Sequence, residues 1–106
     1  MLRITPLTSS SAPVFVLEGQ LAGLWAKELA RLTRANGSGK GSLFDLENVF
    51  YVDSQGEETL RWLNRLGARF ITDTGYGKSL CERLKLHRVS ASEAGLPNLP
   101  KLRRNH

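Results

Sequence analysis

The chain has 106 residues, of which 41% are hydrophobic and 24% charged, and its formal net charge is +5 at pH 7. This length supports one domain with a single core, and no apolar run approaches the roughly 20 residues that span a bilayer. The one cysteine, Cys81, excludes an intramolecular disulfide framework and a thiolate zinc cluster. His87 and His106 are too isolated to indicate a metal site. We therefore expect a globular protein without metal or cofactor, and the lack of a signal-peptide pattern favours a cytoplasmic location.

The excess of positive charge lies at the C-terminal end. Residues 1–77 carry eight basic and eight acidic side chains, whereas residues 78–106 carry seven basic and two acidic ones. No aromatic side chains that could stack on bases accompany Lys101, Arg103 and Arg104. The pattern is typical of a solvated basic tail on a neutral core, so we expect no binding to nucleic acid.

The first 20 residues predict two strands joined by a turn. Apolar and polar residues alternate in Leu2–Leu7, as in an edge or half-buried strand, and Pro6 favours an edge because it cannot donate to a ladder. The composition of Thr8–Pro13 is that of a turn. Val14–Leu17 is a short apolar run, typical of a more buried strand, and we expect it to end at Glu18.

A first helix follows. Its predicted buried stripe consists of apolar residues at spacings of four, four and three: Leu21, Trp25, Leu29 and Leu32. Lys27, Arg31 and Arg34 then occupy the opposite, solvent-facing side. Residues 36–39 (NGSG) predict the end of this helix and a loop.

The central segment Leu43–Leu66 (LFDLENVFYVDSQGEETLRWLNRL) predicts a buried strand, a short loop and an amphipathic helix. Ser54 and Glu57 fit a capping box in which Ser54 is the N-cap of the helix. The buried stripe of this helix is predicted to be Leu60, Leu63 and Leu66. A serine hydroxyl at a helix start, just beyond a strand end, lies where backbone amides favour an anion. We therefore place the functional site at this loop.

The next elements are a strand at Ala68–Thr72, a loop at Asp73–Gly77 and a short helix at Lys78–Leu86. Three residues of this helix are predicted to face inward: Leu80, Cys81 and Leu84. Alternating strands and helices indicate a sheet with parallel pairs covered by helices.

The alternation of strands and helices stops beyond His87. We interpret residues 1–88 as the domain and residues 89–106 as a basic tail that contains proline and leucine. Leu96, Leu99 and Leu102 recur every third residue beside two prolines, which predicts an extended, polyproline-like segment with one apolar face.

The order of elements, with LEGQLAG early and FDLENVFYVDSQG in the middle, resembles the STAS domain family, which includes the bacterial anti-sigma-factor antagonists. The resemblance covers roughly Leu2–Leu86, and its most specific parts are Asp45-Leu46 and VDSQG at 52–56. It implies an α/β fold with a STAS-like mixed β-sheet of four to five strands flanked by helices. It also implies a domain that is not an enzyme.

In that family the serine after the aspartate is phosphorylated by a partner that is both anti-sigma factor and serine kinase, and by position this serine is Ser54. The resemblance implies partner exchange governed by the phosphate. We expect a monomer or weak dimer. The predicted partner-binding residues surround the serine: Asp53, Gln55, Gly56, Glu57, Glu58, Arg61 and Trp62. The sequence departs from the family where an apolar residue usually follows the glycine, because Glu57 and Glu58 stand there and would repel a phosphate.

Each of these residues also has a purely structural interpretation. Ser54 could serve only as an N-cap, worth about 1 kcal/mol, and Asp53 only as a turn residue. Trp62 lies beside the leucine stripe of its helix, so it is either an interface residue or a half-covered structural one. A second function is also open, because some lone STAS domains are accessory subunits of membrane transporters. In that case the helix after Ser54 would contact an ATPase subunit without a phosphate cycle.

Two glycine-rich stretches approximate a phosphate-binding loop. Residues 37–42 (GSGKGS) fail because Arg34 stands in place of the first glycine and Gly41 in place of Ser or Thr. Residues 72–79 (TDTGYGKS) come closer, although Thr72 replaces the first glycine. The nucleotide-binding candidates are Gly75, Gly77, Lys78 and Ser79. We expect weak or no nucleotide binding there, since the first tight turn is missing.

Overall fold

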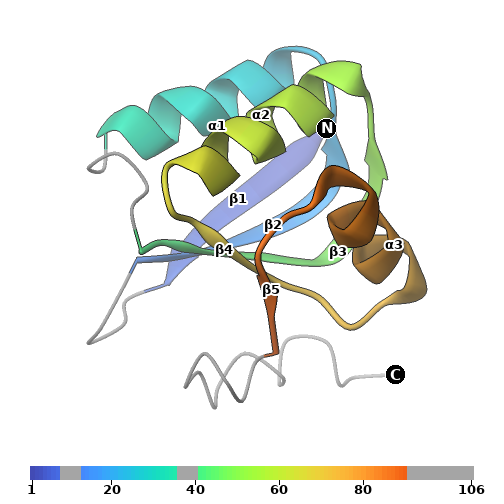
Figure 1. Ribbon diagram of the computed structural model, residues 1–106. Helices are drawn as coiled ribbons and strands as arrows, with labels where there is room; N and C mark the ends of the chain where they lie inside the picture. The colour runs from blue at the N-terminus through green and yellow to red at the C-terminus, as the bar shows by residue number, and fades with distance from the viewer. Residues whose placement is uncertain (8–12, 36–40, 91–106) are drawn as a thin grey trace.

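The computed structural model describes residues 1–7, 13–35 and 41–90, which form one mixed sheet and three helices (Figure 1). The strands are β1 (Leu2–Leu7), β2 (Val14–Leu21), β3 (Leu43–Val52), β4 (Arg69–Ile71) and β5 (Arg88–Val89), and they follow that order in the sheet. The helices are α1 (Leu24–Ala35), α2 (Ser54–Arg65) and α3 (Gly75–Leu84). β1 runs antiparallel to β2, and every other neighbouring pair is parallel. The predicted α/β fold with a mixed sheet flanked by helices is confirmed.

Three predicted features fall wholly or mainly outside the described residues. They are the turn at 8–13, the glycine-rich loop after α1 with its GSGKGS sequence, and the polyproline-like segment of the tail.

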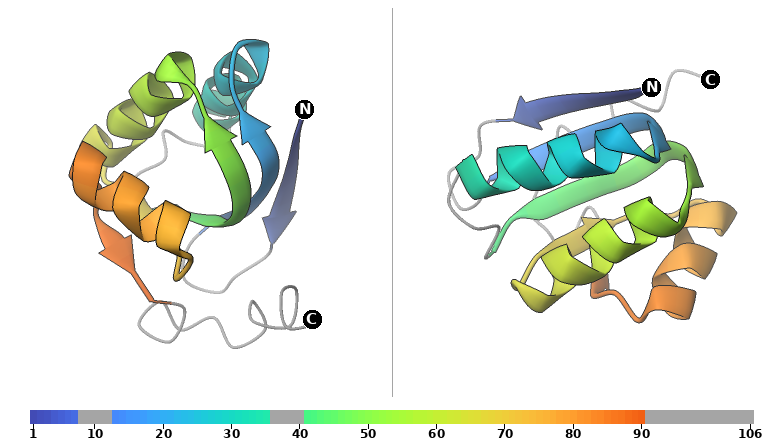
Figure 2. Two further views of the ribbon diagram at one scale, coloured as in Figure 1. Left: turned by 90° about the vertical axis from the view of Figure 1, so that its right-hand side faces the viewer. Right: turned by 90° about the horizontal axis from the view of Figure 1, so that it is seen from above.

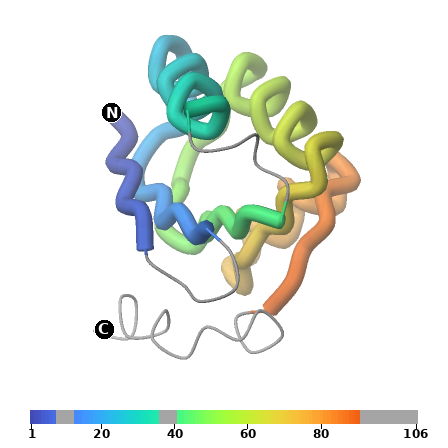
Figure 3. Tube along the Cα trace, turned by 90° about the vertical axis from the view of Figure 1, so that its left-hand side faces the viewer, coloured from blue at the N-terminus to red at the C-terminus, as the bar shows by residue number. Residues whose placement is uncertain are grey.

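The core lies between the sheet and the helices. Phe15, Phe44 and Phe70 stand opposite one another on β2, β3 and β4, and their rings stack with centroids 5.3 and 5.9 Å apart. α1 and α2 lie side by side over this face (Figures 2 and 3). Of the predicted inward residues of α2, Leu60 and Leu63 are fully buried there, whereas Leu66 is the C-cap and is only partly buried.

β1 is an edge strand, as the proline predicts, but β2 is longer than predicted. It continues through Glu18 to Leu21. Gly19 makes this possible because it adopts φ 112°, and a Cβ there would collide with the carbonyl oxygen of Met1. Gln20 N then donates to that same carbonyl at 2.9 Å, so pairing with the N-terminus carries the strand past the expected stop.

The predicted stripe of the first helix is only partly correct, because Leu29 is buried but Trp25 is exposed and Leu32 is only partly buried. Its buried residues are Ala26, Leu29 and Thr33. Leu21 belongs to β2, and the helix begins only at Leu24, so the expected stripe is rotated and Trp25 is 39% exposed. Lys27, Arg31 and Arg34 are exposed, as expected.

The last three elements also differ in their bounds. β4 is shorter than the predicted strand, and α3 begins three residues earlier, at Gly75, because Thr74 caps it. α3 ends at Leu84, where Lys85 adopts the left-handed conformation. The inward residues are confirmed as Leu80, Cys81 and Leu84. β5 was not predicted, and it carries the sheet beyond residue 88.

In the described ranges, no helix combines the length and apolarity that crossing a bilayer requires. Those ranges also hold no group of three or more His, Cys, Asp or Glu side chains placed to bind a metal ion.

Candidate functional site

Asp53 is the N-cap of α2. Its Oδ1 accepts a hydrogen bond from Gly56 N at 2.8 Å, and its backbone oxygen accepts one from Glu57 N at 2.9 Å. The predicted capping box is therefore wrong, because Ser54 is the first helical residue rather than the cap. An aspartate caps a helix as well as a serine does, so the capping function has moved one residue toward the strand.

The second oxygen of the same carboxylate reaches another loop. Asp53 Oδ2 accepts a hydrogen bond from Gly23 N at 3.0 Å, and Asp53 N donates to Leu21 O at 3.3 Å. Gly23 has φ 56°, in the left-handed region that favours glycine. One side chain thus fixes the connection between β2 and α1 to the start of α2, and it holds the position of Ser54.

Gly56 fixes the first turn of α2 at a second point. It is buried, and a Cβ there would collide with Leu21 O and lie 2.7 Å from Cγ1 of Val52. Only glycine fits between the helix and the ends of β2 and β3. Thr59, one turn later, donates to Gln55 O at 3.1 Å within the same helix.

Ser54, Gln55 and Glu58 are the exposed residues among those predicted for the site. The two glutamates of the site are each held by an arginine. Glu57 pairs with Arg83 of α3 at 2.8 Å, and Glu58 pairs with Arg61 at 3.6 Å. Glu57 and Arg61, which are four residues apart on α2, thus have different ionic partners. Because each carboxylate has a guanidinium beside it, less net negative charge lies near Ser54 than the sequence suggests.

Trp62 links the two helices of the layer. It is half-buried and packs against the core. The guanidinium carbon of Arg34, on α1, lies 4.9 Å from the centroid of its ring, within the range of a cation–π interaction. The ring of Trp62, a predicted partner-binding residue, therefore also makes a structural contact between α1 and α2.

Exposed apolar side chains precede Asp53 and follow Gly23 in the chain, and the sequence did not predict them. Phe50 (66% exposed) and Tyr51 (50% exposed) lie near the end of β3, and Leu24 (78% exposed) and Trp25 follow Gly23 directly. The hydrogen bond from Gly23 to Asp53 brings these two pairs to one end of the sheet. An open hollow beside them is lined, among the described residues, by Leu24, Trp25 and Glu28.

A bulge explains why the aromatic pair is exposed. Gly19 stands opposite Val49 and Gln20 opposite Tyr51, so Phe50 has no counterpart on β2. The sequence contained one indication of this exposure. Adjacent residues of a strand face opposite sides of the sheet, so Phe50 and Tyr51 cannot both face one core.

The nucleotide-binding candidates Gly75, Gly77, Lys78 and Ser79 lie at the start of α3. Gly77 N donates to Thr74 Oγ1 at 2.9 Å, and Lys78 N donates to the backbone oxygen of Thr74 at 2.9 Å. A Cβ on Gly77 would collide with Oγ1 of Thr72, so packing alone explains this glycine.

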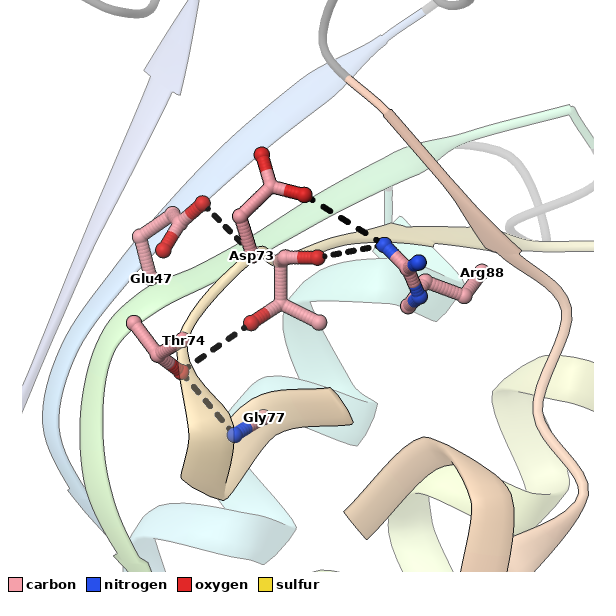
Figure 4. A network of polar contacts seen from close by, with 6 residues as sticks. Glu47, Asp73, Thr74, Gly77 and Arg88 are labelled. Carbon is pink, nitrogen blue, oxygen red and sulfur yellow. Dashed lines mark hydrogen bonds and ion pairs between the residues drawn. The ribbon is translucent and has the colours of Figure 1, made fainter. Parts of the chain in front are cut away.

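Carboxylates lie beside this helix start. Asp73 N donates to Glu47 Oε2 at 2.8 Å, and Arg88 Nη1 lies 3.4 Å from Asp73 Oδ1 (Figure 4). Arg88 also donates to Thr72 O at 2.8 Å. Two carboxylates and amides already engaged by Thr74 disfavour a phosphate, so we continue to expect weak or no nucleotide binding there.

Neither a protein-family model nor a curated protein sequence matches this chain. Solved structures do. A structure of the anti-sigma factor antagonist SpoIIAA in its unphosphorylated form has a TM-score of 0.66 at 15% identity, covering 95% of this chain and 96% of that one. An uncharacterized DUF3478-family protein with a SpoIIAA-like fold, from Shewanella loihica PV-4, has a TM-score of 0.57 at 11% identity, with 84% of each chain covered.

These similarities define the class of fold. The chain has a SpoIIAA-like α/β fold, and the resemblance to STAS-type antagonists is confirmed at the level of the fold. The roles of Ser54 and of the residues around it remain predictions.

Proposed function

We propose that this chain is a non-catalytic regulatory domain of the anti-sigma-factor-antagonist type. It binds an anti-sigma factor that is also a serine kinase, and phosphorylation of Ser54 switches that binding. The fold supports the proposal, since a protein with the same architecture is an anti-sigma factor antagonist that has an unphosphorylated form.

One observation carries the assignment to Ser54. Its side chain is exposed on the first residue of α2, while Asp53 before it and Gly56 two residues later are held in place. Asp53 is bonded to Gly23 and to the first turn of α2, and Gly56 is packed against β2. A hydroxyl presented on a rigid, accessible turn suits a kinase active site better than a buried one does.

The surface around Ser54 is suited to a protein partner. Leu24, Trp25, Phe50 and Tyr51 provide exposed apolar area on the segments that the hydrogen bond from Gly23 to Asp53 joins, and aromatic residues are enriched in protein interfaces. A phosphate would add about −1.5 to −2 charges at pH 7. Placed within an apolar contact, that charge would have to lose its hydration, so the modified surface would release the partner.

The test compares variants of Ser54 against a purified partner. The partner is first recovered from native lysate and identified by mass spectrometry, and its affinity for each variant is then measured by calorimetry. We expect Ser54→Ala to retain affinity and Ser54→Asp to weaken it. Ser79→Asp is the matched control, because it adds the same charge to the exposed first turn of another helix.

Equal affinity of Ser54→Ala and Ser54→Asp for that partner would contradict the switch. Recovery of a transporter ATPase subunit that binds both variants equally would favour the accessory-subunit function instead.

A further inference from the structure

An ion pair ties the first turn of α2 to α3. Arg83, in the last turn of α3, places its Nη1 2.8 Å from Oε2 of Glu57. The Glu57 side chain is 21% exposed, whereas the Arg83 side chain is 55% exposed. α3 lies on the side of α2 opposite to α1 (Figure 2). The guanidinium therefore reaches the start of α2 from a neighbouring helix, and much of it is accessible to a second group.

Glu57 is a close neighbour of Ser54 on the surface of α2. Residues three apart on an α-helix have Cβ atoms about 5–6 Å apart. A helical side chain also leans toward the N-terminal end of its helix, which for Glu57 is the end that carries Ser54. The contact with Glu57 therefore holds the guanidinium of Arg83 in the vicinity of the Ser54 hydroxyl.

Arg83 has donors for more than one anion. A guanidinium carries five N–H donors in a planar fork, which matches carboxylates and phosphates. Within residues 1–7, 13–35 and 41–90, Glu57 is the only ion-pair partner of Arg83, and Nη1 makes that contact. Other N–H groups of the same guanidinium therefore remain for a second acidic group.

We propose that Arg83 binds the phosphate of phosphorylated Ser54 and bridges it to Glu57. This inference rests on the proposed function, because it concerns the phosphate that this function places on Ser54. Hydrogen bonds between a guanidinium and a phosphate are charge-assisted and frequently bidentate. The bridge also offsets the repulsion between the phosphate and the carboxylate of Glu57, which departs from the family pattern in the sequence.

Two backbone amides of this turn are already engaged. Gly56 N donates to Oδ1 of Asp53 at 2.8 Å, and Glu57 N donates to the backbone oxygen of Asp53 at 2.9 Å. A phosphate on Ser54 does not gain these two donors, so side-chain donors carry more of its binding.

The position of Arg61 favours Arg83 over it as that donor. Arg61 lies seven residues beyond Ser54, about 10.5 Å along the helix axis, and it pairs with Glu58 at 3.6 Å. Arg83 meets α2 at Glu57, only three residues and about 4.5 Å from Ser54 along the same axis. The guanidinium from α3 is thus the closer of the two to the start of α2.

Phosphorus NMR on the full chain tests the contact. Phosphoserine is incorporated at position 54 during synthesis, so the measurement needs neither a kinase nor a partner. The pH titration of the phosphorus signal gives the second pKa of the phosphate in the parent chain, in Arg83→Gln and in Arg65→Gln. Arg65→Gln is the matched control, because it removes the same charge from an exposed residue of α2. That residue lies about 16 Å from Ser54 along the helix, twice the Debye length of about 8 Å at physiological salt.

We expect the second pKa of the phosphate to be lower in the parent than in Arg83→Gln by about 0.5 pH unit. The reason is that a guanidinium beside the phosphate stabilises the dianion. Arg65→Gln should have the pKa of the parent, and Arg83→Lys should lie between the parent and Arg83→Gln, because lysine keeps the charge without the planar fork. Equal pKa values in the parent and Arg83→Gln would overturn the proposal, and so would an equal change in Arg65→Gln.

The outcome is separable from that of the switch. A lowered pKa in the parent, combined with unchanged partner affinity on phosphorylation, would support the contact with Arg83 and contradict the proposed function. Equal pKa values, combined with loss of partner binding on phosphorylation, would overturn the role of Arg83 and leave the switch at Ser54 in place.

Discussion

Asp53 accepts a hydrogen bond from the amide of Gly23 at 3.0 Å, although 30 residues separate the two in the chain. Its other oxygen caps α2 through Gly56 N at 2.8 Å. The position of Ser54 thus depends on a carboxylate that bridges two loops.

The first prediction concerns this bridge. Asp53→Ala removes both hydrogen bonds, and we expect a loss of about 2–3 kcal/mol in the free energy of unfolding, from the cap and the buried amide together. Asp53→Asn keeps one acceptor oxygen and replaces the other with an amide that cannot accept, so its loss should be about half as large. Urea unfolding measures both. An unchanged stability of Asp53→Asn would show that the contact with Gly23 contributes nothing, because that variant keeps the cap.

The second prediction contrasts two glycines near helix starts. Gly56→Ala should cost at least about 2 kcal/mol, because the new methyl group meets the carbonyl oxygen of Leu21, which belongs to the sheet and cannot move away. Gly75→Ala is the control, since no atom lies within 4 Å of its Cβ position. It should be neutral or stabilising by up to about 1 kcal/mol. Thermal unfolding compares the two, and similar melting temperatures would contradict the close packing of α2.

The third prediction separates the two interactions of Trp62. Trp62→Ala should lower the free energy of unfolding by about 2–3 kcal/mol, because it removes both the packing against the core and the ring beneath Arg34. Arg34→Ala should cost only about 0.5–1 kcal/mol, the value of a cation–π contact near the surface. Chemical denaturation of the two single variants and the double variant gives the coupling energy. A coupling energy of zero would show that the contact between Arg34 and Trp62 does not stabilise the fold.

The fourth prediction concerns Cys81. Burial raises the pKa of its thiol from 9.0 to about 11, while Arg88 acts weakly in the opposite direction. At neutral pH the native thiol should therefore react with thiol reagents far more slowly than the thiol of the chain in urea.

The pH dependence of stability follows from the same pKa. The raised value means that the unfolded chain loses this proton first, so the contribution of Cys81 to stability is complete below about pH 9 and is lost as the pH rises toward about 11. Subtracting the stability curve of Cys81→Ala removes the other groups that titrate there. A flat difference between pH 8 and 11 would contradict the raised pKa.

Helical periodicity in the sequence correctly predicted buried residues of α2 and α3. Leu60 and Leu63 of α2, and Leu80 and Leu84 of α3, are buried as their spacing indicates, because helical periodicity depends only on neighbours in the chain. The prediction failed for strands whose extent depends on pairing with residues far away in the sequence. β2 extends through Gly19 because Met1 pairs beside it, and a strand of two residues such as β5 exists only beside β4.

The sequence predicted that Ser54 lies at a helix start beyond a strand end, but it did not predict the contacts that hold this turn. The strand end followed by an exposed serine at a helix start is visible in the sequence, and the structure places Ser54 there. The bridge from Asp53 to Gly23 is not visible, because hydrogen bonds across 30 residues leave no periodic signal. The exposure of Phe50 likewise arises from a bulge set by the register with β2.

The capping by Asp53 has a consequence for how a modification of Ser54 would be read. The amides of Gly56 and Glu57 are already bonded to Asp53, so a phosphate on the neighbouring hydroxyl would not gain those donors and has no reason to rearrange the turn. Phosphorylation would then change the charge of the surface but not the conformation of the backbone. The modified and unmodified forms would differ in their affinity for a partner protein, while their backbones would be nearly the same.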